Sequence, residues 1–160
     1  MDLGHRIWDF VYSVGAILSV WILFFKLAHR RRWREYYVAF GFSGLIAMVI
    51  CIWAYVYKYW YYPSGFYDDF FSIMIKDVAF FSVFGMLYTH FMRKKLHKNI
   101  LLVAAMSLVN TGFEAATLNF TNLVGYYDKM NYYITFITYC IGYLFVMIHN
   151  YIFGNTNLKK

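Results

Sequence analysis

The chain has 160 residues, of which 62% are hydrophobic and only 14% are charged, and its formal net charge is +7. A soluble domain of this length cannot hide so much apolar surface, because too many of its residues must face water. The basic residues lie in short connections between apolar runs, so the positive charge indicates membrane topology and argues against nucleic acid as a partner.

Five apolar segments follow one another along the chain, each longer than the roughly 18 residues that cross about 30 Å of hydrocarbon. They cover residues 7–28, 37–58, 69–92, 100–123 and 131–153. We therefore expect one domain, residues 1–160, that folds as an all-α integral membrane bundle of five transmembrane helices. Four crossings are the alternative, with one segment lying at the membrane surface.

The connections predict the orientation of the bundle, because basic residues concentrate on the cytoplasmic side of a membrane. The first segment ends in FFKLAHRRRWRE without a small-residue cleavage site, so it is expected to be retained with the N-terminus outside. Alternate connections and the C-terminal tail hold most of the basic residues: Lys26, Arg30, Arg31, Arg32, Arg34, Arg93, Lys94, Lys95, Lys98, Lys159 and Lys160. We expect a cytoplasmic C-terminus and a place in the cytoplasmic membrane.

The second connection is rich in tyrosine and tryptophan, in the stretch WAYVYKYWYY of residues 53–62. Amphipathic rings favour the headgroup level, so an interfacial belt is the first interpretation and an aromatic ligand site is the second. The third segment carries Lys76 and Asp77, about two turns in from its outer end. A charged side chain at that depth needs a partner, because its burial in lipid is costly.

The fourth segment has a polar stripe with the spacing of one helix face. Its members are Ser107, Asn110, Thr111, Glu114, Thr117 and Thr121. The opposite positions are apolar: Leu108, Phe113, Leu118 and Phe120. We expect the stripe to face the bundle interior, either as interhelical hydrogen bonds or as the lining of a small pathway. Gly112 and Ala116 beside it predict the close approach of another backbone.

Lys76 is the partner that we expect for Glu114. The third segment runs inward and the fourth runs outward, so the two residues lie at similar depths in the outer half of the membrane. Pairing an ammonium with a carboxylate offsets much of the cost of burying either one. Asp77 adjoins Lys76 but points about 100° away around the helix, which makes it a poorer partner. A static ion pair is the first interpretation, and a proton-accepting group is the alternative.

The histidines and cysteines form no recognisable metal or redox motif. His90 and His149 lie near the cytoplasmic ends of their segments, without a second ligand three or four residues away. Cys51 and Cys140 are single cysteines in different segments. We expect no metal site and no cofactor.

Three aspartates, Asp68, Asp69 and Asp128, fall in the predicted outer connections. An enzyme acting on lipids could gather acids there, but aspartates in short connections are more often solvated. The chain contains no G-x-S-x-G, H-E-x-x-H or Walker motif. We therefore do not expect an enzyme.

The stretch EAATLNFTNLVGY, from Glu114 to Tyr126, has the form of a glutamate, six residues, and then Thr-Asn-Leu-Val-x-Tyr. Together with RRWREYY at residues 31–37, it resembles a family of small multi-pass membrane proteins of endospore-forming bacteria. The matching residues are Glu114, Thr121, Asn122, Leu123, Val124 and Tyr126. The resemblance implies an integral membrane protein and brings no assigned activity.

These observations predict a structural or interaction component of the membrane with a buried polar seam. Its expected partners are the lipid bilayer and, across the seam, a second copy or another membrane protein. The alternative is a small transporter or channel component that binds a proton or a solute at Glu114 and Lys76.

Overall fold

The computed structural model describes residues 3–61 and 70–153 of the chain. Five α-helices make up most of this part: α1 (Leu3–Leu27), α2 (Trp33–Val56), α3 (Phe70–Phe91), α4 (Leu96–Phe120) and α5 (Tyr132–Ile152). A 3-10 helix, η1 (Arg30–Arg32), joins α1 to α2. Each helix begins and ends within four residues of an apolar segment expected from the sequence, so the all-helical prediction is confirmed.

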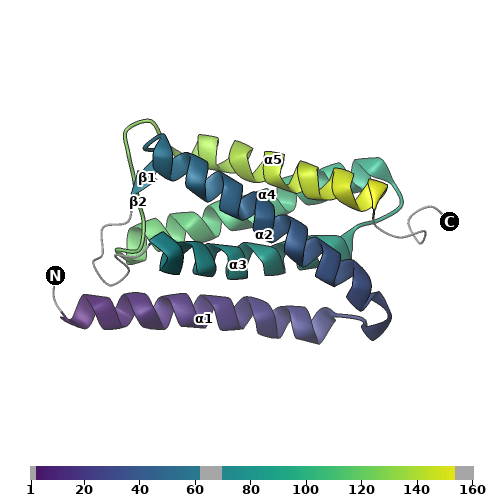
Figure 1. The fold of residues 1–160 in the computed structure, drawn as a ribbon, viewed down its shortest axis with the longest axis horizontal. Helices are drawn as coiled ribbons and strands as arrows, with labels where there is room; N and C mark the ends of the chain where they lie inside the picture. Colours follow the sequence, from purple (N-terminus) through teal and green to yellow (C-terminus); the bar gives the residue numbers. More distant parts are fainter. Residues whose placement is uncertain (1–2, 62–69, 154–160) are drawn as a thin grey trace.

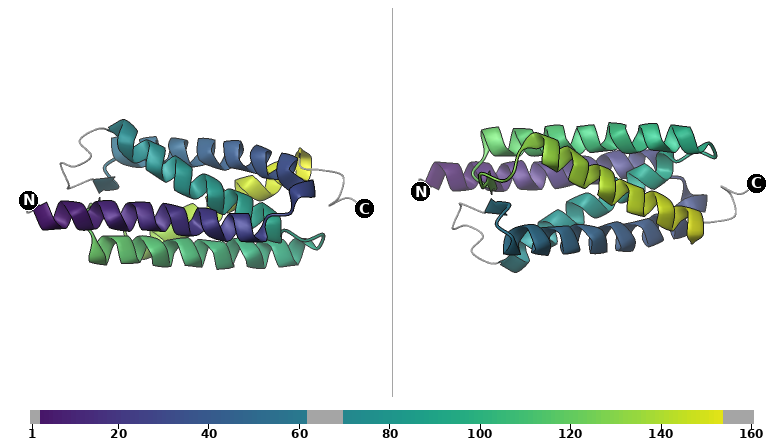
Figure 2. Two further views of the ribbon diagram at one scale, coloured as in Figure 1. Left: turned by 90° about the horizontal axis from the view of Figure 1, so that it is seen from below. Right: turned by 90° about the horizontal axis from the view of Figure 1, so that it is seen from above.

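The helices run roughly along the long axis of the molecule, and their connections gather at two ends (Figure 1). The α1–α2 and α3–α4 connections share one end with the last turn of α5, and the α4–α5 connection lies at the other (Figure 2). We call the first the basic end; its residues are Lys26, Arg30, Arg31, Arg32, Arg34, Arg93, Lys94, Lys95 and Lys98. The other is the β end, because two short strands meet there.

The strands of the β end are β1 (Trp60–Tyr61) and β2 (Gly125–Tyr126), and the sequence did not predict them. They pair antiparallel, with Trp60 opposite Tyr126 and Tyr61 opposite Gly125. A Cβ atom at position 125 would lie 2.8 Å from the Tyr61 hydroxyl, so only glycine leaves room for this ring. The strand pair joins the α2–α3 and α4–α5 connections at one end of the helical bundle.

Helix α3 lies at the centre of the bundle, since residues 82–89 are all buried. Its closest neighbour is α2, where serine and glycine face each other: a Cβ atom at Gly44 would lie 2.6 Å from Ser82 Oγ, and one at Gly85 would overlap Ser43 Oγ. Small side chains thus set the distance between these two helices. Phe80, on the same helix, packs against Phe84 and Phe113 in the core.

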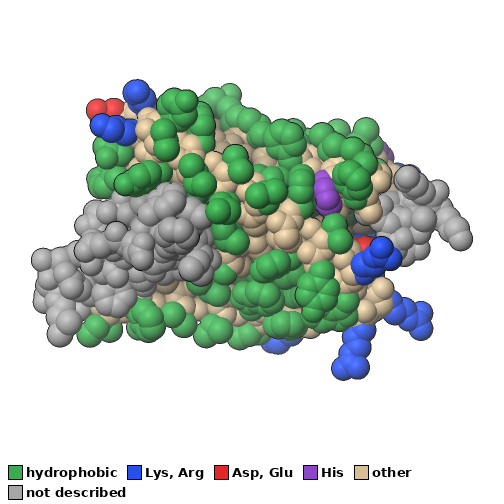
Figure 3. Space-filling view, in the orientation of Figure 1, with side chains coloured by type: hydrophobic (Ala, Val, Ile, Leu, Met, Phe, Trp, Pro, Cys, Tyr) green, Lys and Arg blue, Asp and Glu red, His purple; other side chains and the backbone are tan. Residues whose placement is uncertain are grey.

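The flanks of the bundle are covered by hydrophobic side chains, while lysine and arginine side chains lie mainly toward the ends (Figure 3). Four helical stretches are long and apolar enough to cross a membrane: Ile7–Leu27, Arg30–Val56, Leu96–Phe120 and Tyr132–Ile152. In α3, the apolar stretch within the described residues is shorter, Val78–Phe91.

Candidate functional site

The polar stripe of α4 faces the other helices. Ser107, Asn110, Thr111 and Thr121 are buried, and Glu114 and Thr117 are half-buried. On the opposite face, Leu108 and Phe120 are 66% and 68% exposed. Phe113 departs from the expected pattern: its ring stacks on Phe80, with 4.6 Å between centroids, because it borders the stripe and points into the core.

Close approach of a backbone at Gly112 is not observed in the described part of the chain, where a Cβ atom on Gly112 would meet nothing within 4 Å. Gly112 is exposed, so its small size serves no contact within the described residues. The expectation was therefore wrong at Gly112, and at Ala116 it stays a prediction.

Much of the stripe is satisfied by its own helix. The hydroxyls of Thr111, Thr117 and Thr121 donate to carbonyl oxygens four residues earlier, at 2.8, 3.0 and 2.6 Å. Two bonds cross to other helices: Asn110 Nδ2 donates to Tyr143 OH of α5 at 2.7 Å, and Thr117 Oγ1 lies 3.1 Å from Tyr12 OH of α1. The polar stripe of α4, which we call the seam, is therefore hydrogen-bonded partly to other helices and partly to the backbone of its own helix.

Glu114 lies at the centre of the seam and contacts two tyrosines. Tyr126 OH donates to Oε1 at 2.5 Å, and Tyr139 OH donates to Oε2. Tyr126 OH also lies 2.7 Å from Thr135 Oγ1. Since Tyr126 comes from β2 and Tyr139 from α5, one carboxyl group joins α4 to the following connection and to the next helix.

Tyr126 lies outside the helices and is well suited to donate a hydrogen bond to Glu114. Burial and the neighbouring carboxyl group of Glu114 raise the pKa of its phenol. The hydroxyl therefore keeps its proton over the whole physiological pH range and remains a hydrogen-bond donor to Glu114.

The stretch from Glu114 to Tyr126 folds back over the carboxyl group of Glu114. After α4 ends, Leu123 and Val124 turn inward, and Tyr126 returns to Glu114 twelve positions after it. The backbone N–H of Asn122 donates to Asp9 Oδ1 of α1 at 3.1 Å. The motif therefore describes one local structure, a helix end folded back onto its own glutamate.

The expected ion pair between Lys76 and Glu114 lies outside the described residues, as do the side chain of Asp77 and the whole of Asp68 and Asp69. Within the part of the chain that is described, the carboxylate of Glu114 meets phenols, and the ion pair that is present joins Arg32 to Glu35 at 2.7 Å.

A cavity of about 200 Å³ adjoins Glu114 inside the bundle. All five helices contribute to its walls, and Trp60 of β1 and Met130 of the α4–α5 connection also line it. The walls are mostly apolar and aromatic. Two buried polar atoms of lining residues have no hydrogen-bond partner in the described structure: Asn110 Oδ1 and Trp60 Nε1.

Asp9 of α1 is a buried acid that the sequence analysis did not single out. It is 0% exposed, and its Oδ2 atom has no partner among the described residues. A periodic signal was present: Asp9, Ser13, Val20 and Phe24 share the buried face of α1.

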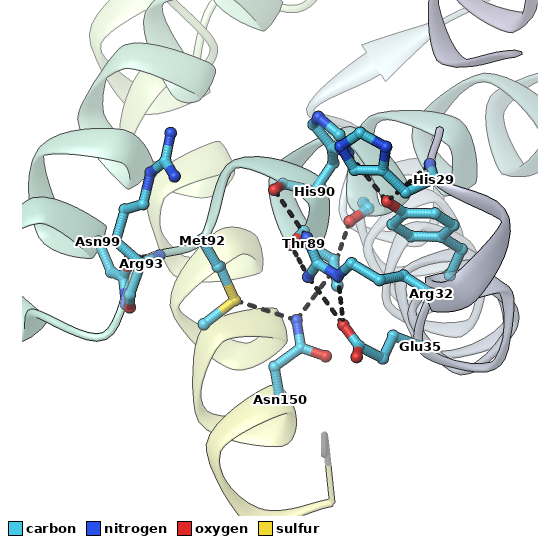
Figure 4. Close-up of polar contacts among 11 residues, drawn as sticks. His29, Arg32, Glu35, Thr89, His90, Met92, Arg93, Asn99 and Asn150 are labelled. Carbon is cyan, nitrogen blue, oxygen red and sulfur yellow. Dashed lines mark hydrogen bonds and ion pairs between the residues drawn. The ribbon is translucent and has the colours of Figure 1, made fainter. Parts of the chain in front are cut away.

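A second polar cluster lies at the basic end (Figure 4). Arg32 reaches from η1 to the end of α3, where its guanidinium donates to the carbonyl oxygens of Thr89 and His90 at 2.9 and 3.0 Å. These carbonyls belong to the last turn of a helix and have no partner within it. On the other side of the same turn, Asn150 of α5 donates to Thr89 Oγ1 at 2.8 Å.

The two histidines singled out from the sequence contact different groups. His90 Nδ1 lies 2.9 Å from Tyr36 OH, and its ring lies 5.4 Å from that of His29. His149 stacks on Phe42 at 3.9 Å. No cluster of three or more possible metal ligands occurs among the described residues.

Comparison of the chain with protein-family models, with curated proteins and with solved structures finds no match.

Proposed function

We propose that this chain is a structural or interaction component of the cytoplasmic membrane, in which the Glu114 seam fastens α4 to α5 and to the connection between them. The observation that carries the proposal is the pair of tyrosines on the Glu114 carboxyl group. A buried acid is costly unless its oxygens are hydrogen-bonded, and here each oxygen has a donor from a different segment.

In this proposal the chain crosses the membrane five times, with α3 as the central span. Four helices have the length and apolarity of spans, and α3 lies among them with its connections at the two ends. The basic end would face the cytoplasm, which places the N-terminus and the β end outside. Glu114 and its cavity then lie in the outer half of the membrane. The exposed apolar flanks would contact lipid, a second copy or another membrane protein.

A small transporter or channel component is the second candidate, and the cavity beside Glu114 favours it. In this candidate Glu114 binds a proton or a solute, and Lys76 supplies a nearby positive charge. A structural seam needs no empty volume, whereas a binding site does.

Replacement of Glu114 separates the two candidates. If the seam is structural, Glu114→Gln keeps a hydrogen-bonding side chain and leaves the free energy of unfolding nearly unchanged. Glu114→Leu removes both acceptors and should cost about 1–3 kcal/mol. Reversible unfolding of the purified protein in mixed micelles measures both values. If Glu114 moves protons or solute, Glu114→Gln folds normally but abolishes uptake into vesicles.

Asp128→Leu is the matched control, since Asp128 is an exposed acid in the α4–α5 connection. It should leave the unfolding free energy unchanged. A Glu114→Leu protein as stable as the unaltered chain contradicts the structural seam.

A further inference from the structure

The cavity beside Glu114 is large enough for a small organic molecule. Its volume of about 200 Å³ exceeds the roughly 150 Å³ of an engineered apolar cavity that holds benzene. It is far too small for a sterol, a haem or a lipid with its chains. The size therefore selects ligands of about one ring and a short side chain.

Two hydrogen-bond acceptors of the wall, Asn110 and Glu114, lie one turn apart on α4, whereas Trp60 Nε1 of β1 is an unpaired donor. Asn110 is 2% exposed, its Nδ2 donates to Tyr143, and its Oδ1 has no partner among the described residues. Glu114 follows one turn later on the same face, about 6 Å along the helix axis. An unpaired buried amide oxygen is costly, so the α4 side of the wall is complementary to a ligand that donates hydrogen bonds.

The charge of the cavity wall indicates which kind of hydrogen-bond donor the ligand carries. The described lining contains a carboxyl group and no lysine, arginine or histidine. Aromatic rings surround the space, among them Phe80, Tyr139 and Tyr143. Ring faces attract cations, and a protonated amine offers both the positive charge and several N–H donors.

We propose that the cavity binds a small organic ammonium ion, with its N–H groups on the Glu114 carboxylate and Asn110 Oδ1 and its apolar part between the rings. This names the solute of the second candidate above and rests on that candidate's binding site, but it requires no transport. Lys76 is the competing cation: if its ammonium fills the same place, an external amine gains nothing from the carboxylate.

Phenethylamine and phenethyl alcohol test the proposal, because they match in shape and differ in charge. Equilibrium binding to the full chain in nanodiscs can be followed by tryptophan fluorescence, since Trp60 lies in the wall. We expect the amine to bind about tenfold more tightly than the alcohol. Partition into lipid affects both probes and is measured with empty nanodiscs.

Three variants locate the site. Glu114→Gln should remove the preference for the amine, and Asp128→Asn, at an exposed position, should keep it. Ala47→Leu fills part of the cavity and should weaken both probes, because Ala47 lines the space. Melting temperatures show whether each variant is folded.

Equal affinity of the unaltered protein for the two probes overturns the proposal, as does an amine preference that survives in Glu114→Gln. The comparison in the unaltered protein stands even if that variant fails to fold. Unfolding measurements on Glu114→Leu report separately on the structural seam, so failure of the ligand proposal leaves that role to be judged by itself.

Discussion

The carboxyl groups of Glu114 and Asp9, one half-buried and one fully buried, have different numbers of hydrogen-bond partners. Both oxygens of Glu114 accept hydrogen bonds from tyrosines. Asp9 uses only Oδ1, which accepts from the backbone N–H of Asn122 just after the end of α4. Its Oδ2 is buried without a partner in the described structure. Each oxygen of Glu114 thus has one protein donor, whereas one oxygen of Asp9 has none among the described residues.

Asp9 should therefore tolerate an amide better than an apolar side chain. Asp9→Asn keeps the acceptor for Asn122 and buries no charge, so we expect an unchanged or higher free energy of unfolding. Asp9→Leu leaves that N–H unpaired and should lower the unfolding free energy by about 1–3 kcal/mol. Denaturation in mixed micelles gives both numbers. Equal losses in the two variants would show that the acceptor at Asp9 is unimportant.

Among the elements, the α2–α3 pair depends most directly on small residues. Ser43 faces Gly85, and Ser82 faces Gly44, so that the two helices approach closely where they cross. At Gly85 an added Cβ would also lie 2.5 Å from Ser43 Cβ. A Cβ atom is fixed to the backbone and cannot rotate away as the Ser43 hydroxyl can, so extra volume there must separate the helices.

Gly85→Ala should lower the unfolding free energy by about 1–3 kcal/mol, as overpacking of a tight contact does. Gly112→Ala is the matched control, because nothing lies within 4 Å of its added Cβ. In that open position alanine should be neutral or add up to about 1 kcal/mol through its higher helix propensity. The same thermal or denaturant experiment measures both variants, and a similar response from the two would contradict the close crossing.

Across the whole molecule, charge is distributed unevenly between the two ends. The basic end has nine lysine and arginine residues, whereas three basic residues, Arg6, Lys58 and Lys129, lie toward the β end, together with Asp128. This asymmetry underlies the proposed orientation, because a bilayer protein keeps its basic connections on the cytoplasmic side.

Single cysteines in a chain with Cys51 and Cys140 replaced by alanine test the orientation. A membrane-impermeant maleimide should label Lys58→Cys and Lys129→Cys in intact cells, and Lys94→Cys only after the membrane is opened. The reverse labelling pattern would show that the bundle has the opposite orientation in the membrane. Labelling of Lys58→Cys and Lys94→Cys from one side would show that α3 does not cross, which contradicts five spans.

The sequence alone determined the helices and the direction of the α4 stripe. Both are local properties: the length of an apolar run limits a helix, and the 3.6-residue period assigns each side chain to a face. The inward position of Ser107 and Asn110 and the outward position of Leu108 follow from that period. The basic connections were visible in the same way, since they lie between the apolar runs.

Only the tertiary structure decided which groups meet. The two tyrosines on Glu114, the pairing of β1 with β2, the burial of Asp9 and the volume of the cavity all depend on segments far apart in sequence. The period of a helix says that a side chain faces inward but not which helix it faces. The contact at Gly85 and the open space at Gly112 make the same point: two glycines in apolar helices look alike in sequence, and only packing distinguishes them.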